Sequence, residues 1–238
     1  MTKTHKEIKA IPTLEEYLSW DIYIWNKALN FWREVLNSHK NEKGLALEVG
    51  SKDGGLSLFL SYDFGFKTFC TDIEEINSDA SELHKKYGAE NKISYSIADA
   101  CSLNFSSDMF DVVILKSVLG SIGKNDNTNQ VKKAIAEIYR VLKPGGILLY
   151  AENAKGSFIH TALRKIFRRW AVYWKYFSIN EIESLLVNFS RMEIHTAGVI
   201  SAFFSGTGTK KKVLPLDNIL EKITPENSRY MIYGYAQK

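Results

Sequence analysis

The chain has 238 residues, of which 45% are hydrophobic and 24% charged, and its formal net charge is +4. A domain of this length buries enough surface to need no disulfide, and so mild a basic excess does not by itself indicate a nucleic-acid partner. The Lys-rich first ten residues lack the apolar core of a signal peptide, and no apolar run reaches the length of a membrane span. We therefore expect a cytoplasmic protein in which Cys70 and Cys101 are reduced thiols, since their spacing fits no zinc pattern.

Residues 13–37 are predicted to be helical and are crowded with aromatic side chains. Such a segment could stack on a sugar or another planar substrate, or it could pack over a sheet and close a ligand site. We favour packing as a lid, with three tryptophans mostly buried: Trp20, Trp25 and Trp32.

Strands and helices then alternate over residues 45–152, which we take as the core of a single domain spanning 1–238. Apolar runs predict strands at 45–49, 67–71, 92–97, 110–115 and 147–151. Amphipathic patterns and turn signals predict helices at 54–62, 76–87 and 127–142. This alternation indicates an α/β fold with a parallel sheet, and its almost wholly apolar strands indicate a sheet buried on both faces.

A glycine-rich turn follows the first predicted strand, where Glu48 precedes Gly50 and Gly54. Glycines there allow a tight turn and the close approach of the backbone to a ligand. Asp72 and Asp99 follow the second and third strands. Open α/β sheets bind ligands at the carboxyl ends of their strands, and an acid after the second strand commonly holds a ribose diol. The pattern therefore predicts a nucleotide-like ligand at this edge.

The pattern Glu48-x-Gly50-x-x-x-Gly54-x-x-Ser57 resembles the first motif of class I S-adenosylmethionine-dependent methyltransferases. The strand at 110–115 (FDVVIL) and the segment at 137–146, which ends in Pro144-Gly145-Gly146, are similar to later motifs of that family. The resemblance is strong over 45–151 and looser over 176–238. It implies a Rossmann-like, doubly wound seven-stranded sheet, mostly parallel with an antiparallel last strand and helices on both faces.

The resemblance also implies S-adenosylmethionine as the cofactor. Asp72, followed by Ile73, resembles the acid that holds the ribose, and Asp99-Ala100 resembles the pair that borders the adenine. Lys52 departs from the family, which often has glycine there; it could meet the methionine carboxylate or be a solvated lysine on the turn. The implied cofactor-binding set is Glu48, Gly50, Lys52, Gly54, Asp72, Ile73, Asp99, Ala100 and Lys116.

The same fold is compatible with two other functions. A nicotinamide-dependent dehydrogenase needs G-x-G-x-x-G, but the glycines here fall at 50, 54 and 55. A non-catalytic binding module could keep the fold and lose the cofactor, and the three acids argue against it. The five histidines show no ligand spacing, so no metal is expected, and no G-x-S-x-G nucleophile motif is present.

Methyl transfer mainly requires that the two reactants be positioned, and a base is needed only for a poor nucleophile. The acceptor-side candidates follow the fourth and fifth strands: Lys116, Ser117, Glu152, Asn153 and His160. His160 is a candidate base by its chemistry, or a surface residue. We expect transfer to a small-molecule or saccharide acceptor, with O-methylation first and N-methylation or another small-molecule methylation as the alternative.

Residues 155–177 form a basic and aromatic segment without any acidic residue, which we expect to cap the acceptor site. A helix there could present a cationic face to an anionic substrate or to a membrane surface, which would make the protein peripheral. It could equally be a cap with a solvated basic face. A nucleic-acid partner ranks lower because no RNA-binding module accompanies the segment. Residues 178–238 are expected to complete the sheet, with a helix at 180–188 and strands at 191–196 and 229–235.

Overall fold

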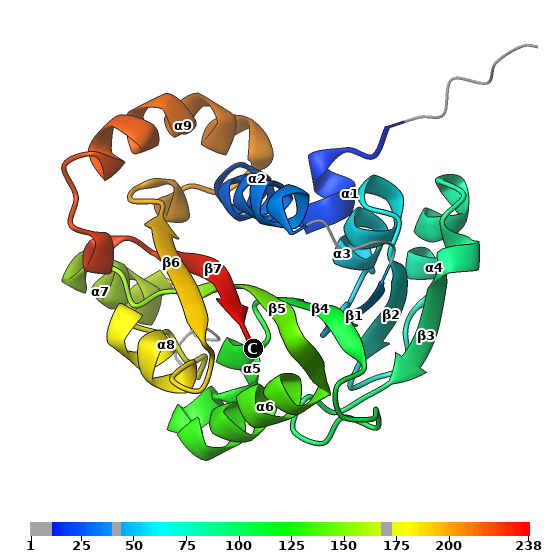
Figure 1. The fold of residues 1–238 in the computed structure, drawn as a ribbon. Helices are drawn as coiled ribbons and strands as arrows, with labels where there is room; N and C mark the ends of the chain where they lie inside the picture. Colours follow the sequence, from blue (N-terminus) through cyan, green and yellow to red (C-terminus); the bar gives the residue numbers. More distant parts are fainter. Residues whose placement is uncertain (1–10, 40–43, 168–172) are drawn as a thin grey trace, which may run out of the picture.

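A computed structural model describes residues 11–39, 44–167 and 173–238, with backbone only for 164–167 (Figure 1). Its centre is one seven-stranded sheet in the order β3-β2-β1-β4-β5-β7-β6. β7 runs antiparallel to both of its neighbours, and the pairs among β1 to β5 are parallel. This confirms the predicted fold class. The strands are β1 (Leu45–Val49), β2 (Lys67–Asp72), β3 (Ile93–Ile97), β4 (Phe110–Lys116), β5 (Leu142–Asn153), β6 (Arg191–Ala197) and β7 (Met231–Gln237).

The sheet is buried on both faces because its central strands carry apolar side chains at successive positions. Ala46 and Val112 point into one hydrophobic cluster, whereas Leu47 and Val113 point into the other. Strands of this kind cannot stand with one face in water, so helices must cover both sides. The edge strand β3 differs, because most of its side chains are exposed.

One face is covered by α1 (Leu14–Leu18), α2 (Ile22–Ser38), α3 (Gly55–Leu58), the π-helical turn Phe59–Asp63, α4 (Ser78–Lys86) and α9 (Thr207–Glu221). The other face is covered by α5 (Leu119–Ile122), α6 (Thr128–Val141) and α8 (Ile179–Leu185) (Figure 1). α7 (Phe158–Phe167) follows β5 at the periphery. Single 3-10 turns lie at Glu90–Lys92, Lys124–Asp126, Ser201–Phe203 and Glu226–Ser228.

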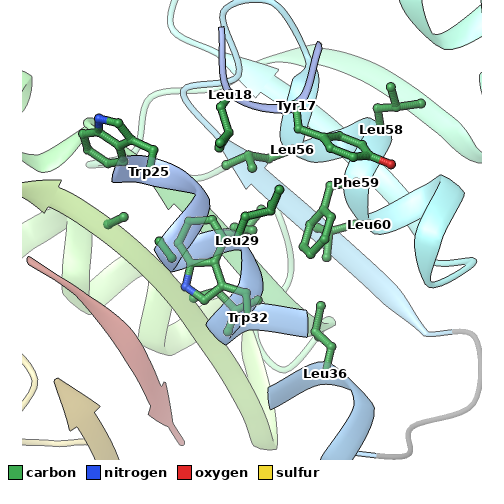
Figure 2. Close-up of a cluster of buried hydrophobic side chains, with 14 of the residues drawn as sticks. Tyr17, Leu18, Trp25, Leu29, Trp32, Leu36, Leu56, Leu58, Phe59 and Leu60 are labelled. Carbon is green, nitrogen blue, oxygen red and sulfur yellow. The ribbon is translucent and has the colours of Figure 1, made fainter. Parts of the chain in front are cut away.

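The predicted helical segment 13–37 consists of two helices rather than one. α1 begins with a capping box between Thr13 and Glu16, and it ends where Ser19 and Asp21 take positive φ angles of 62° and 48°. Figure 2 shows α1 and α2 packed against the hydrophobic side chains of residues 56–60. The break turns α2 across the sheet, so the lid covers the glycine-rich loop with one helix and the strands with the other.

The burial predicted for the lid tryptophans is confirmed for two of the three. Trp25 and Trp32 are 1% and 0% exposed, and the Trp32 indole N–H donates to the Gly234 carbonyl at 3.2 Å. For Trp20 the prediction is wrong: this residue is 40% exposed. It lies in the break between α1 and α2, where it packs edge-to-face on Trp25 with ring centroids 4.9 Å apart.

The basic segment 155–177 is only partly as predicted. α7 covers Phe158–Phe167, while Arg168 and Arg169, two of the cations on which the prediction depended, lie outside the described residues. Lys175 is not on a solvated face, since it is 8% exposed and its Nζ lies 3.1 Å from Asp126 and 3.4 Å from Glu181. Lys155 also pairs with Glu181, at 2.8 Å. Carboxylates from neighbouring elements therefore neutralise both ends of the segment.

Candidate cofactor and acceptor site

The loop after β1 has the left-handed backbone that a glycine-rich turn requires. Gly50, Lys52 and Gly54 have φ angles of 70°, 49° and 73°. A Cβ on Gly50 would lie 2.5 Å from Val118 Cγ2, so a side chain there would be both strained and obstructed. Lys52 adopts the same backbone region at a conformational cost. Its side chain is exposed, with Nζ 3.5 Å from Asp53.

Glu48 stabilises this loop through hydrogen bonds to Ser57. Its side chain is buried, and Oε2 accepts hydrogen bonds from the Ser57 backbone N–H at 2.8 Å and from the Ser57 hydroxyl at 2.5 Å. Burial raises the pKa of the Glu48 carboxyl to about 7. The residue therefore ties β1 to the first turn of α3 and shapes the loop around the expected cofactor site.

His84 supports the same loop from α4, a contact that the sequence analysis did not find. Its buried ring lies 2.8 Å from the Gly54 carbonyl through Nε2 and 2.6 Å from the Tyr95 hydroxyl through Nδ1. A carbonyl only accepts, so Nε2 carries the proton and Nδ1 accepts from Tyr95. Burial lowers the pKa of His84, which keeps the ring neutral. Its position four residues after the buried Ala80, on the inner face of α4, was the available signal.

Asp72 lies at the end of β2 beside the loop. Its Oδ2 accepts from the Lys52 backbone N–H at 2.9 Å, and its Oδ1 accepts from the Ile73 N–H at 2.7 Å. Each carboxylate oxygen can accept a further hydrogen bond, so the carboxylate is able to hold a diol while it positions the loop. The Ile73 side chain is exposed beside it.

Asp99 and Ala100 follow β3, which lies next to β2 in the sheet. Asp99 is exposed, and its Oδ1 accepts from the Cys101 N–H at 2.8 Å, while Ala100 is buried. Asp72 itself pairs in register with Ile97, two residues before Asp99. The structure thus brings the predicted ribose and adenine residues to neighbouring strand ends, as expected from the topology.

Lys116 ends β4 beneath the break in the lid. Its ammonium lies 4.2 Å above the Trp20 ring and 4.7 Å above the Trp25 ring. Burial, together with the nearby charge of Lys52, lowers the pKa of Lys116 to about 7. Two indole faces stabilise the cation through their quadrupoles, and the desolvation that accompanies them opposes its charge.

Glu152 supports the backbone that follows β4. It is fully buried and accepts from three successive N–H groups: Val118 at 2.8 Å, Leu119 at 2.7 Å and Gly120 at 3.2 Å. Burial raises the pKa of the Glu152 carboxyl to about 7. Because both of its carboxylate oxygens accept backbone N–H groups at the start of α5, Glu152 is a positioning residue.

Two further acceptor-side candidates lie at the same strand ends. Ser117 has a positive φ of 57°, and its hydroxyl accepts from the Asn153 side-chain amide at 3.0 Å. The strand ends of β4 and β5 are thereby joined beside Lys116.

His160 lies in a buried cluster at the start of α7. Its Nε2 is 2.7 Å from the Val199 carbonyl, and its Nδ1 is 3.1 Å from the Ser157 backbone nitrogen. The ring is also stacked on Phe203 with centroids 4.7 Å apart. Because both ring nitrogens have partners, this geometry favours a structural role over the catalytic role considered from the sequence.

The residues at the strand ends fit an S-adenosyl nucleoside by the chemistry of their donors and acceptors. Carboxylates at Asp72 and Asp99 can accept from the ribose hydroxyls and the adenine amine, and the loop backbone allows close approach. Within the described ranges, no cluster of three or more His, Cys, Asp or Glu side chains could hold a metal ion. None of the helices in those ranges is long and apolar enough to cross a membrane.

Comparison with known proteins finds similarity to methyltransferases. Residues 47–150 match a family model described as a methyltransferase domain. The ubiquinone/menaquinone biosynthesis C-methyltransferase UbiE of Haemophilus ducreyi is 31% identical over 150 residues, covering 61% of this chain and 53% of that protein. The chain spans about half the length of curated bacterial relatives such as this one.

Two solved structures share the fold. Phosphoethanolamine N-methyltransferase 2 of Haemonchus contortus, in complex with S-adenosyl-L-methionine, has a TM-score of 0.62 at 18% identity, covering 97% of this chain and 61% of the other. A SAM-dependent methyltransferase of Archaeoglobus fulgidus has a TM-score of 0.59 at 14% identity, covering 90% and 93%. S-adenosylmethionine is the methyl donor of the matched family. Over residues 47–150 this chain therefore resembles a methyltransferase domain, and it shares its fold with two methyltransferases of known structure.

Proposed function

We propose that the chain transfers a methyl group from S-adenosylmethionine to the hydroxyl of a small-molecule or saccharide acceptor, and that Lys116 removes the proton of that hydroxyl. The acceptor would lie between the ends of β4 and β5 and the break in the lid. The observation that carries the proposal is the position of the Lys116 ammonium, at the end of β4 and against the Trp20 and Trp25 rings.

The cofactor supplies a methyl group on a sulfonium, which needs no further activation by the protein. The chain's own contribution is to bind and orient. Asp72 would accept the ribose hydroxyls while it holds the Lys52 N–H, and Asp99 would border the adenine. Glu48 and His84 keep the glycine-rich loop in its left-handed shape. Lys52, with an exposed side chain, would reach the methionine carboxylate.

A hydroxyl is a poor nucleophile at neutral pH, so its methylation benefits from a base. With a pKa of about 7, Lys116 is neutral in roughly half of the molecules at pH 7 and can accept a proton. His160 and Glu152 are weaker candidates, because both ring nitrogens of the histidine and both carboxylate oxygens of the glutamate already have partners.

N-methylation of an amine is the second candidate. The Trp20 and Trp25 rings already hold one ammonium, and the same aromatic faces would suit a cationic amine. The H. contortus neighbour is named as an N-methyltransferase. An amine also has to lose a proton before it attacks, so Lys116 would keep its role with either acceptor.

The first experiment is calorimetric titration with S-adenosylmethionine, with NAD as the control ligand. Binding of the first alone supports the proposal, and the absence of S-adenosylmethionine binding contradicts it. Methyl transfer from labelled cofactor is then measured against panels of hydroxyl and amine acceptors. Methylation found only on amines would replace the first candidate by the second.

Two substitutions test the base. Lys116→Arg keeps a cation over the indoles but cannot release a proton at neutral pH. It is expected to lower kcat at least 100-fold while cofactor affinity stays within a few-fold. Lys124→Arg is the matched control, because Lys124 also lies over an indole, 5.5 Å from the Trp174 centroid. Full activity in Lys116→Arg would show that the site needs only the charge.

A further inference from the structure

α9 is anchored to the rest of the protein by polar bonds and by Leu214, which packs against the hydrophobic core. Lys210 Nζ lies 2.7 Å from Asp21 on the lid, and Glu221 lies 2.7 Å from Lys27 of α2. The fully buried Asp217 accepts from the backbone N–H groups of residues 199–201, the shortest of these bonds being 2.6 Å. Residues 210, 214, 217 and 221 share one face of a helix, so this is the inner face of α9.

The outer face of α9 is apolar and basic. Leu216 and Ile219 are 51% and 60% exposed, and Ile223, in the turn that follows, is 77% exposed. Helical spacing places them on one stripe, within an arc of roughly 60°. Three exposed lysines accompany the stripe: Lys211, Lys212 and Lys222. The usual arrangement of a surface helix is thus partly reversed, because both carboxylates point inward while Leu216 and Ile219 point outward.

We propose that the outer face of α9 docks on an anionic membrane surface. The three aliphatic side chains would enter the boundary between headgroups and acyl chains, and the lysines would meet the anionic headgroups. This surface is separate from the segment 155–177 that the sequence suggested, and it makes no use of the cofactor site.

Charge complementarity selects this occupant. Both carboxylates of α9, Asp217 and Glu221, are taken up by inner-face partners, which leaves the stripe with cations only. Among residues that the structure describes, none forms an ion pair with Lys211, Lys212 or Lys222. A second copy of the same face would bring these like charges together, whereas anionic lipid would neutralise them.

Docking would place α9 between the bilayer and the lid. α9 lies beside α2 at the edge of the molecule (Figure 1). The Lys210–Asp21 ion pair joins it to the residue that follows Trp20. The break in the lid over Lys116 would then lie beside the docked helix.

The test is co-sedimentation of the full chain with vesicles of phosphatidylcholine containing one quarter phosphatidylglycerol, and with pure phosphatidylcholine. The variant Leu216→Glu/Ile219→Glu reverses the apolar stripe, and Lys211→Glu/Lys212→Glu reverses the charge. Val187→Glu is the matched control, since Val187 is 72% exposed after α8 on the opposite face of the sheet. Thermal unfolding verifies that each variant is folded, and S-adenosylmethionine binding verifies the distant site.

The unchanged protein and Val187→Glu are expected to sediment with anionic vesicles but not with neutral ones, and to be released by 0.5 M salt. Each α9 variant should lower the vesicle partition coefficient at least tenfold. Each lysine near an anionic membrane surface changes that coefficient about fivefold. Three results would overturn the proposal. These are no sedimentation of the unchanged protein, equal loss in Val187→Glu, or a dimer in analytical ultracentrifugation that Leu216→Glu/Ile219→Glu converts to monomers.

Discussion

Substituting Gly55 by alanine tests whether the lid packs on the glycine-rich loop as it does in the structure. Gly55 is the first residue of α3, and its backbone touches α1. A Cβ there would overlap the Tyr17 carbonyl oxygen and lie 2.6 Å from the Glu16 carbonyl oxygen. Helix propensity favours alanine over glycine by up to about 1 kcal/mol. Propensity therefore predicts that Gly55→Ala raises the free energy of unfolding, whereas packing predicts that it lowers it.

The loss of stability in Gly55→Ala depends on which atoms have to move. Neither backbone oxygen can turn away as a side chain could, so α1 must shift as a unit. Overpacking of this kind costs about 1–3 kcal/mol. Full undocking would expose Tyr17 and Leu18, which are 4% and 1% exposed, at roughly 1.5–3 kcal/mol each. After the gain in propensity, we expect Gly55→Ala to lower the free energy of unfolding by about 1–2 kcal/mol.

Gly208→Ala is the matched control. Gly208 also lies in the first turn of a helix, but a Cβ there meets no atom within 4 Å. It should raise the free energy of unfolding by up to about 1 kcal/mol. Urea unfolding of both variants, fitted with one shared m-value, gives the free energies of unfolding to be compared. If Gly55→Ala is as stabilising as Gly208→Ala, α1 does not pack on the loop and the described lid is wrong.

Three further predictions concern the site. Because Lys116 must lose its proton to act as a base, kcat/KM should rise about tenfold per pH unit below pH 7 and level off above it; a flat profile over pH 6–8 would exclude that role. Because burial lowers the pKa of His84, the unfolded chain binds a proton first as the pH falls below 6.5, and stability drops there. Denaturant titrations at pH 7.5 and 5.5 should show a smaller drop in the free energy of unfolding for His84→Gln than for the unchanged protein. An equal drop would refute the role of His84 in this pH dependence. Asp72→Asn should weaken S-adenosylmethionine binding about 10- to 100-fold, measured by calorimetry against Asp108→Asn at the opposite end of the sheet; unchanged affinity would remove the ribose role.

Much of the core could be predicted from the sequence because its signals are local. The strand at Leu45–Val49 has the predicted bounds, β4 extends one residue beyond its predicted end, and β7 begins and ends two residues later than predicted. Apolar runs bounded by turns identify buried strands whatever lies around them. The glycines and acids at the strand ends follow from the same local order, because parallel strands bring their carboxyl ends to one edge.

α9 was not predicted, for a physical reason. Its pattern contains Pro215, and two of its large apolar residues, Leu216 and Ile219, face solvent. A sequence pattern identifies an apolar stripe but not the direction in which it points. That direction depends on bonds to distant partners, such as Lys27 and Asp21, almost two hundred residues away in the chain.

The sequence by itself therefore determined the fold class and the position of the glycine-rich loop after β1, since these depend on spacing along the chain. Only the tertiary structure decided which polar residues face which partners. It enclosed His84 beneath the loop, gave both ring nitrogens of His160 partners and placed Lys116 against two indoles. Contacts of this kind join residues from separate elements, and their pKa values and roles follow from the packing around them.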